Sequence, residues 1–113
     1  MARRPKRRYL AVYEEPKADP EDIARALESA YEELFGKLGL ASAMLKLVRS
    51  YPDRGVVIIR CSLESLSKTI LAIASVTRIG EERTALRILS ISGTIRSLKD
   101  RLEEKNRLKR IGC

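Results

Sequence analysis

Short apolar stretches recur along the chain, separated by turn signals and by longer segments with helical spacing. Four of the short stretches are rich in β-branched or aromatic residues and predict strands over residues 9–13, 43–49, 56–61 and 84–91. Residues 51–55 place a proline and a glycine where a tight turn needs them. The second and third stretches therefore form a predicted hairpin.

Three longer segments show apolar residues on one helical face. The first helix is predicted to begin at Asp19, which precedes a proline and two acids, and to end at Gly36 and Gly39. A second helix is predicted after a capping Ser62 and ends near Thr77, and residues 79–82 form the loop that follows it. A third helix begins after the triplet Ser92, Gly93 and Thr94, with Ile95, Leu98 and Leu102 facing inward.

The order of these elements is β-α-β-β-α-β with one further helix. This order predicts an α+β fold of the ferredoxin-like (RRM-like) type, a four-stranded antiparallel sheet with an additional C-terminal helix. The chain of 113 residues is long enough for one such domain, which we place at residues 9–102. A basic flexible N-terminal arm over residues 1–8 and a basic C-terminal tail over residues 103–113 flank it.

The strands are apolar on both sides, which is typical of a sheet covered on both faces. In this topology two helices cover one face, so the other is covered by the third helix, by a protein partner, or by both. We expect both, with the partner surface formed by Val56, Ile58, Leu86 and Ile88. RNA recognition motifs expose aromatic residues on this face, but the third strand after Arg54 and Gly55 is aliphatic at those positions. We therefore do not expect recognition by base stacking.

Positive charge collects at the two ends of the chain. Residues 1–8 contain five bases and no acid, residues 93–113 contain seven bases and three acids, and residues 9–92 contain eleven bases and twelve acids. Two basic ends around a nearly neutral body favour a polyanionic partner such as nucleic acid, although solubility alone is the alternative.

Several basic groups are candidates for RNA phosphate contacts, each with a plainer structural reading. The basic residues along one side of the terminal helix are equally typical of a solvated face. The triplet at residues 92–94 is also typical of a simple helix cap, and an ion pair is the alternative for Arg60. The candidate RNA-binding residues are Arg3, Arg4, Lys6, Arg7, Arg8, Arg60, Ser92, Gly93, Thr94, Arg96, Lys99, Arg107 and Arg110.

The residues expected of an autonomous enzyme are missing. The sequence has no histidine, and its two cysteines, Cys61 and Cys113, have no evident activating partner and suggest neither a disulfide nor a metal site. No catalytic residue, metal ligand or cofactor of this chain is therefore predicted. No apolar stretch is long enough for a membrane span and no export signal is evident, so a cytoplasmic location is expected.

Several short motifs resemble the family of ribonuclease P protein component 2, the small subunit of archaeal-type ribonuclease P. The resemblance runs roughly from Arg8 to Lys99, and it departs after Cys61 and beyond Asp100. Its motifs are Arg8-Tyr9-Leu10-Ala11, Leu34-Phe35-Gly36-Lys37-Leu38-Gly39, Arg54-Gly55, Arg60-Cys61 and Ser92-Gly93-Thr94-Ile95-Arg96.

The resemblance implies a subunit that binds ribonuclease P RNA together with protein component 3 and promotes removal of the 5′ leader from precursor tRNA. It implies that the RNA catalyses hydrolysis with bound magnesium, so the isolated chain would be inactive. Association with other ribonuclease P proteins is also implied, and a heterotetramer with component 3 is one possible assembly. The alternative, from the residues alone, is a non-catalytic ferredoxin-like interaction or regulatory module without an RNA role.

Overall fold

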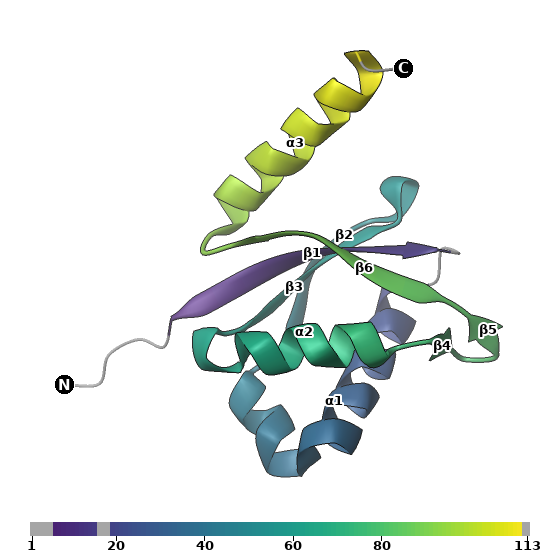
Figure 1. Cartoon of the computed structure of the whole chain (residues 1–113), viewed down its shortest axis with the longest axis vertical. Coiled ribbons are helices and arrows are strands. Elements are labelled where there is room, and N and C mark those ends of the chain that lie inside the picture. The colour runs from purple at the N-terminus through teal and green to yellow at the C-terminus, as the bar shows by residue number, and fades with distance from the viewer. Residues whose placement is uncertain (1–5, 16–18, 112–113) are drawn as a thin grey trace.

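A four-stranded antiparallel sheet forms the centre of the protein (Figure 1). The computed structural model describes residues 6–15 and 19–111. The strands are β1 (Arg7–Glu15), β2 (Lys46–Tyr51), β3 (Val56–Ser62) and β6 (Ala85–Ser92), in the order β2-β3-β1-β6. This order, with every pair antiparallel, confirms the predicted ferredoxin-like fold.

Helices lie on both sides of the sheet. Figure 1 shows α1 (Pro20–Ala43) and α2 (Leu66–Ser75) together on one face, whereas α3 (Ile95–Ile111) rises from the other side and projects beyond the sheet. Short 3-10 turns precede β3 (η1, Pro52–Arg54) and α2 (η2, Leu63–Ser65). The α3 backbone is helical through most of the region predicted as a separate tail, since the helix continues to Ile111.

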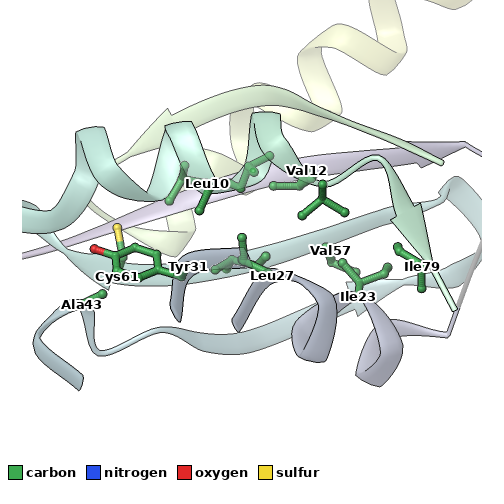
Figure 2. Packing of buried hydrophobic residues seen from close by; sticks show 13 residues of the cluster. Leu10, Val12, Ile23, Leu27, Tyr31, Ala43, Val57, Cys61 and Ile79 are labelled. Atoms are coloured by element: carbon green, nitrogen blue, oxygen red, sulfur yellow. The ribbon is translucent and has the colours of Figure 1, made fainter. Parts of the chain in front are cut away.

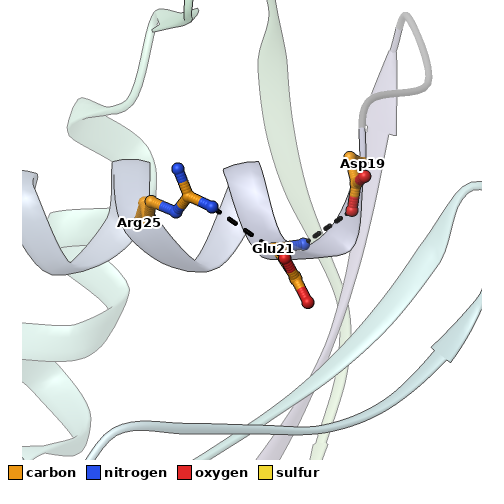
Figure 3. Close-up of polar contacts among 3 residues, drawn as sticks. All are labelled: Asp19, Glu21 and Arg25. Atoms are coloured by element: carbon orange, nitrogen blue, oxygen red, sulfur yellow. Dashed lines mark hydrogen bonds and ion pairs between the residues drawn. The ribbon is translucent and has the colours of Figure 1, made fainter.

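The first helix begins as predicted but ends later. Figure 3 shows the cap, in which Asp19 Oδ1 accepts a hydrogen bond of 3.1 Å from the backbone N–H of Glu21. The side chain of Glu21 also pairs with Arg25 at 3.9 Å, and both side chains are exposed. The predicted end at the glycines is wrong, because Gly36 (φ 78°, ψ 173°) only kinks the helix, which then resumes to the buried Ala43.

The start of α2 also differs from the prediction. Ser62 does not cap this helix through its side chain. Its hydroxyl instead donates to the carbonyl oxygen of Ser42 at 3.3 Å, and η2 leads into α2. This bond between the end of β3 and the end of α1 could not be read from local sequence, because the two serines are brought together only by the fold.

The larger core lies between the sheet and the helices α1 and α2. Figure 2 shows Leu10, Val12 and Val57 from the strands opposite Ile23 and Leu27 from α1, all at most 2% exposed. Full burial of one such side chain stabilises a fold by about 1.5 to 3 kcal/mol. This layer fixes the sheet and both helices as one unit.

A second, smaller cluster lies on the opposite face of the sheet. Ala11, Val56 and Ile58 from the strands pack with Leu98 of α3, which is completely buried. Further side chains on this face are only partly buried and include Tyr9, Tyr13, Val48, Tyr51, Leu89 and Leu102. The prediction that α3 covers this face is thus confirmed for the part around Leu98.

A β-bulge decides which face the side chains of β6 join. Ala11 pairs with Ser90 and its neighbour Val12 pairs with Ile88, so Leu89 is an extra residue on β6. Leu86 and Ile88 pack into the core under α1 and α2, whereas Leu89 joins the cluster of the other face. The expectation that Leu86 and Ile88 share one surface with Val56 and Ile58 is therefore wrong, because β6 places them on the opposite face.

A short hairpin occupies the segment predicted as a loop. It consists of β4 (Arg78–Ile79) and β5 (Glu82–Arg83), joined through Gly80 and Glu81. Gly80 has a φ of 62°, a conformation that favours glycine and occurs in tight hairpin turns. Ile79 is 7% exposed and belongs to the larger core, which anchors the hairpin to the domain.

Candidate nucleic-acid interface

The turn between β6 and α3 is a well-formed helix cap. The hydroxyl of Thr94 accepts a hydrogen bond of 3.2 Å from the N–H of Ser97, and the hydroxyl of Ser92 accepts one of 3.4 Å from the N–H of Thr94. The N–H groups of Ile95 and Arg96 have no partner within the helix, as in any first turn. The triplet at residues 92–94 therefore caps the helix, as its plainer interpretation predicted. The same turn also presents two backbone N–H donors and the exposed Arg96 at one place.

Arg8 lies directly against this turn. A Cβ atom at Gly93 would be only 3.3 Å from Nη1 of Arg8, so the absence of a side chain at Gly93 makes room for the guanidinium. The same nitrogen donates to the carbonyl oxygen of Arg7 at 2.9 Å. Two of the predicted RNA-binding features, the basic start of the chain and the 92–94 triplet, are thus in contact.

Part of the predicted N-terminal arm belongs to the sheet. Arg7 and Arg8 are residues of β1, opposite Ser62 and Cys61 of β3, so their inclusion in a flexible arm over residues 1–8 is wrong. The carbonyl oxygen of Lys6 accepts a hydrogen bond of 2.8 Å from Leu63, which extends this pairing by one residue. Lys6 and Arg7 are exposed and Arg8 is half-buried, whereas Arg3 and Arg4 lie outside the described residues.

Arg60 lies in the row of paired residues that follows the row of Arg8 and Cys61. This row runs through Lys46, Arg60, Tyr9 and Ser92 on β2, β3, β1 and β6. Arg60 is half-buried and forms no ion pair with a described acidic side chain, so nothing in the described chain supports its ion-pair reading. Two bases therefore lie side by side at the end of the sheet where α3 begins.

We call Arg7, Arg8, Lys46, Arg60 and Arg96 the basic end of the sheet. They come from four separate elements that meet at one end of the sheet, where β1 and β2 start and β3 and β6 end. Lys46 and Arg60 share the face of Tyr9 and α3, whereas Arg8 lies on the face of Cys61. Cations that lie close together repel one another unless a polyanion neutralises them, so the grouping suits a phosphate backbone.

The α3 candidates divide into separate groups. Lys99 lines an open cleft of about 430 Å³ between η1 and α3, together with two arginines, Arg49 and Arg54, and two acids, Asp53 and Glu103. Arg101, which was not among the candidates, donates from Nη1 to the carbonyl oxygen of Ile91 at 2.8 Å. The side chains of Arg107 and Arg110 lie outside the described part of α3, so their predicted contacts stay predictions.

Three tyrosines on the face that carries α3 were missed by the sequence reasoning. Tyr9 and Tyr13 come from β1 and Tyr51 from β2, and all three are half-buried. The guanidinium of Arg87 lies 5.5 Å from the ring centre of Tyr13, within the range of a cation–π interaction. The alternation of Tyr9, Ala11 and Tyr13 along one strand was the signal that could have revealed them.

Cys61 is too deeply buried to act as a reactive thiol. It is 1% exposed, and burial raises its pKa above the ordinary value, an effect that a hydrogen bond with Thr69 and the charge of Arg8 oppose. The described residues contain no cluster of three or more potential metal ligands. No helix within the described part of the chain is long and apolar enough to cross a membrane.

These features define a ferredoxin-like protein with a cationic surface at one end of its sheet. The model of the Rpp14/Pop5 family matches residues 8–103, and the chain belongs to this family. The match covers nearly the same interval as the short motifs that resemble ribonuclease P protein component 2, and it confirms that resemblance.

Relatives with known names support the same assignment. Ribonuclease P protein component 2 of Archaeoglobus fulgidus is 36% identical over 98 residues, which cover 85% of this chain and 87% of the relative. The protein of the same name from Pyrococcus furiosus is 31% identical over 98 residues, or 85% of this chain and 82% of the relative.

A solved structure shares the fold. A chain in the cryo-EM structure of yeast ribonuclease MRP superposes with a TM-score of 0.63, with 14% sequence identity and coverage of 98% of this chain and 99% of that one. At this level of identity the likeness concerns the fold alone.

Proposed function

We propose that this chain is a protein subunit of ribonuclease P that binds the catalytic RNA together with a second protein, component 3, and promotes removal of the 5′ leader from precursor tRNA. The basic end of the sheet is the observation that supports an RNA contact most directly. There Arg8 touches the turn that starts α3, and Arg60 and Arg96 lie nearby on β3 and α3.

The basic end suits the RNA backbone better than the bases. Guanidinium groups bind phosphate oxygens through paired hydrogen bonds, and the N–H groups of a helix start add further donors. Contacts of this kind set the position of a protein on RNA without reading sequence. The role of Arg7, Arg8, Arg60 and Arg96 in this proposal is therefore to hold the folded RNA.

Catalysis in this proposal belongs to the RNA. The family resemblance implies that magnesium bound to the RNA supplies the hydrolytic chemistry. The positive side chains of this subunit would reduce repulsion between phosphates that the active RNA fold brings together, so that less magnesium is needed.

The exposed part of the sheet face that carries α3 is the proposed contact with component 3. Its half-buried residues Tyr9, Tyr13, Tyr51 and Leu89 surround the area that Leu98 covers. Tyrosines, which combine apolar area with a polar tip, are enriched in protein interfaces. Leu86 and Ile88 are not part of this proposed surface, because they pack under α1 and α2.

Reconstitution tests the proposed function. Leader removal is measured at limiting magnesium with the catalytic RNA and component 3, with and without the chain, and we expect the chain to lower the magnesium requirement. The double variant Arg60→Gln/Arg96→Gln should lose this effect and reduce the slope of log affinity against log salt by about 1 to 2 units.

The matched control removes two charges elsewhere. Arg25 and Lys37 are exposed on α1, which lies on the other face of the sheet from α3, and Arg25→Gln/Lys37→Gln should leave both readouts unchanged. If the chain associates only with protein, in a manner that survives ribonuclease, and shows no salt-dependent RNA binding, the proposal is wrong and the regulatory-module alternative is favoured.

A further inference from the structure

The hairpin of β4 and β5 carries two arginines directly opposite each other. Arg78 and Arg83 are register partners, as are Ile79 and Glu82. Since neighbouring residues on a strand point to opposite faces, and Ile79 is buried in the core, the face that carries the two arginines is turned outward. Both arginine residues are exposed.

The arginines border a hollow in the surface. Its volume is about 620 Å³, and its lining consists of Thr77, Arg78, Arg83, Thr84 and Ala85. The base of the hairpin is closed by a hydrogen bond of 3.1 Å from the N–H of Thr84 to the carbonyl oxygen of Thr77. The hollow thus combines two guanidinium groups with two threonines on a closed backbone frame.

No acid balances this pair within the described chain. Neither Arg78 nor Arg83 forms an ion pair or a side-chain hydrogen bond with a described residue. The nearest acids along the chain are Glu81, at the tip, and Glu82, on the opposite face of the hairpin, and neither lines the hollow. Like charges placed opposite each other destabilise a strand pair, and a two-stranded ribbon is only marginally stable by itself.

We propose that this hairpin binds a backbone phosphodiester of RNA between Arg78 and Arg83. An oxyanion there would replace repulsion between the two guanidinium groups by charge-assisted hydrogen bonds, and the hydroxyl of Thr77 offers a further donor. This inference rests on the proposed function, which supplies the RNA, and it adds a second contact site that the sequence did not suggest.

The position of the hairpin separates it clearly from the basic end of the sheet. The hairpin precedes Ala85 at one end of β6, and the basic end lies at Ser92. Seven residue steps along an antiparallel strand span about 24 Å, so the two sites lie at opposite ends of the sheet (Figure 1). Phosphate contacts at both ends would fix the orientation of the domain on the RNA, which one contact cannot do.

The test compares full-length chains in RNA binding at several salt concentrations. The double variant Arg78→Gln/Arg83→Gln is measured against wild type and against Arg25→Gln/Lys37→Gln, with the catalytic RNA and precursor tRNA in separate arms. We expect the slope of log affinity against log salt to fall by about 1 to 2 units on one of the two RNAs, with no change in the control. Circular dichroism confirms that all three chains are folded.

The outcomes separate this inference from the function on which it rests. A reduced slope on either RNA supports the phosphate site and identifies which RNA occupies it. If wild type binds RNA with a steep salt dependence and the Arg78→Gln/Arg83→Gln chain behaves identically on both RNAs, the inference is overturned while the proposed function stands. If wild type binds neither RNA, both fail.

Discussion

A Cβ atom at Gly93 would lie 3.3 Å from Nη1 of Arg8. The side chain of Arg8 in the first strand therefore packs closely against the turn that starts the last helix. Because the neighbouring atom is the tip of a flexible side chain, a residue larger than glycine displaces the guanidinium without disturbing the core. The contact therefore links the position of one cation to the identity of a residue 85 positions away in the chain.

Replacing Gly93 should separate RNA binding from stability. In Gly93→Val we expect the free energy of unfolding to change by less than about 1 kcal/mol, since the position is exposed, while RNA affinity falls because Arg8 is displaced. Chemical denaturation and a salt-resolved binding assay measure the two effects. Arg8→Gln is the matched control, and an affinity lowered by Arg8→Gln but not by Gly93→Val would contradict this account.

Truncation of Leu98 should release α3 from the sheet. Leu98 is completely buried in the smaller cluster, and loss of such a side chain to alanine costs about 2 to 5 kcal/mol. We expect this loss in urea denaturation, with faster proteolysis within α3. Leu38→Ala is the control, because Leu38 is 86% exposed and its truncation should change stability by less than about 0.5 kcal/mol. Equal effects from the two variants would show that Leu98 does not hold α3.

Reversal of one charge in the hairpin should stabilise the free protein. Arg83→Glu places opposite charges in the register pair with Arg78 and should raise the free energy of unfolding by about 0.2 to 1 kcal/mol. The same change should weaken RNA binding, since the proposed phosphate site loses one cation. Arg83→Lys keeps the repulsion and should leave stability unchanged within error. A destabilised Arg83→Glu chain would show that the two arginines do not repel each other.

Cys61 should make the protein less stable at alkaline pH. Burial raises its pKa in the folded state above the ordinary value of 9.0, so the folded chain keeps a proton that the unfolded chain releases. The contribution is fully present below pH 9.0 and decreases as the pH rises from there towards the folded-state pKa. Urea denaturation of wild type and Cys61→Ala across this range measures it, and parallel stability curves for the two chains would refute it.

Local signals predicted the elements of this fold more reliably than their ends. The cap at Asp19 and the turn over residues 51–55 were correct because each depends on a few neighbouring residues. The end of α1 was not, because packing of the segment up to Ala43 continues the helix beyond the kink at Gly36. The hairpin of β4 and β5 was missed because strands of two residues carry almost no periodic signal.

The candidate site was predicted in part. The sequence identified basic residues near both ends of the chain, and the structure shows that Arg8 meets the turn at Gly93. It did not reveal Lys46 beside Arg60, Arg101 bound to Ile91, or the three tyrosines on one face. Each of these relationships joins separate elements, so its signal lies in pairing between strands and not in spacing along the chain.

By itself the sequence determined the element order, the ferredoxin-like topology, the family resemblance and the concentration of charge near both ends. These depend on local propensity and on the right-handed crossovers that limit the possible topologies. Only the tertiary structure decided the faces of β6 and the grouping of the cations, because one bulged residue at Leu89 reverses the alternation of every side chain beyond it. Register is set by contacts between strands distant in the chain, and no local pattern encodes such contacts.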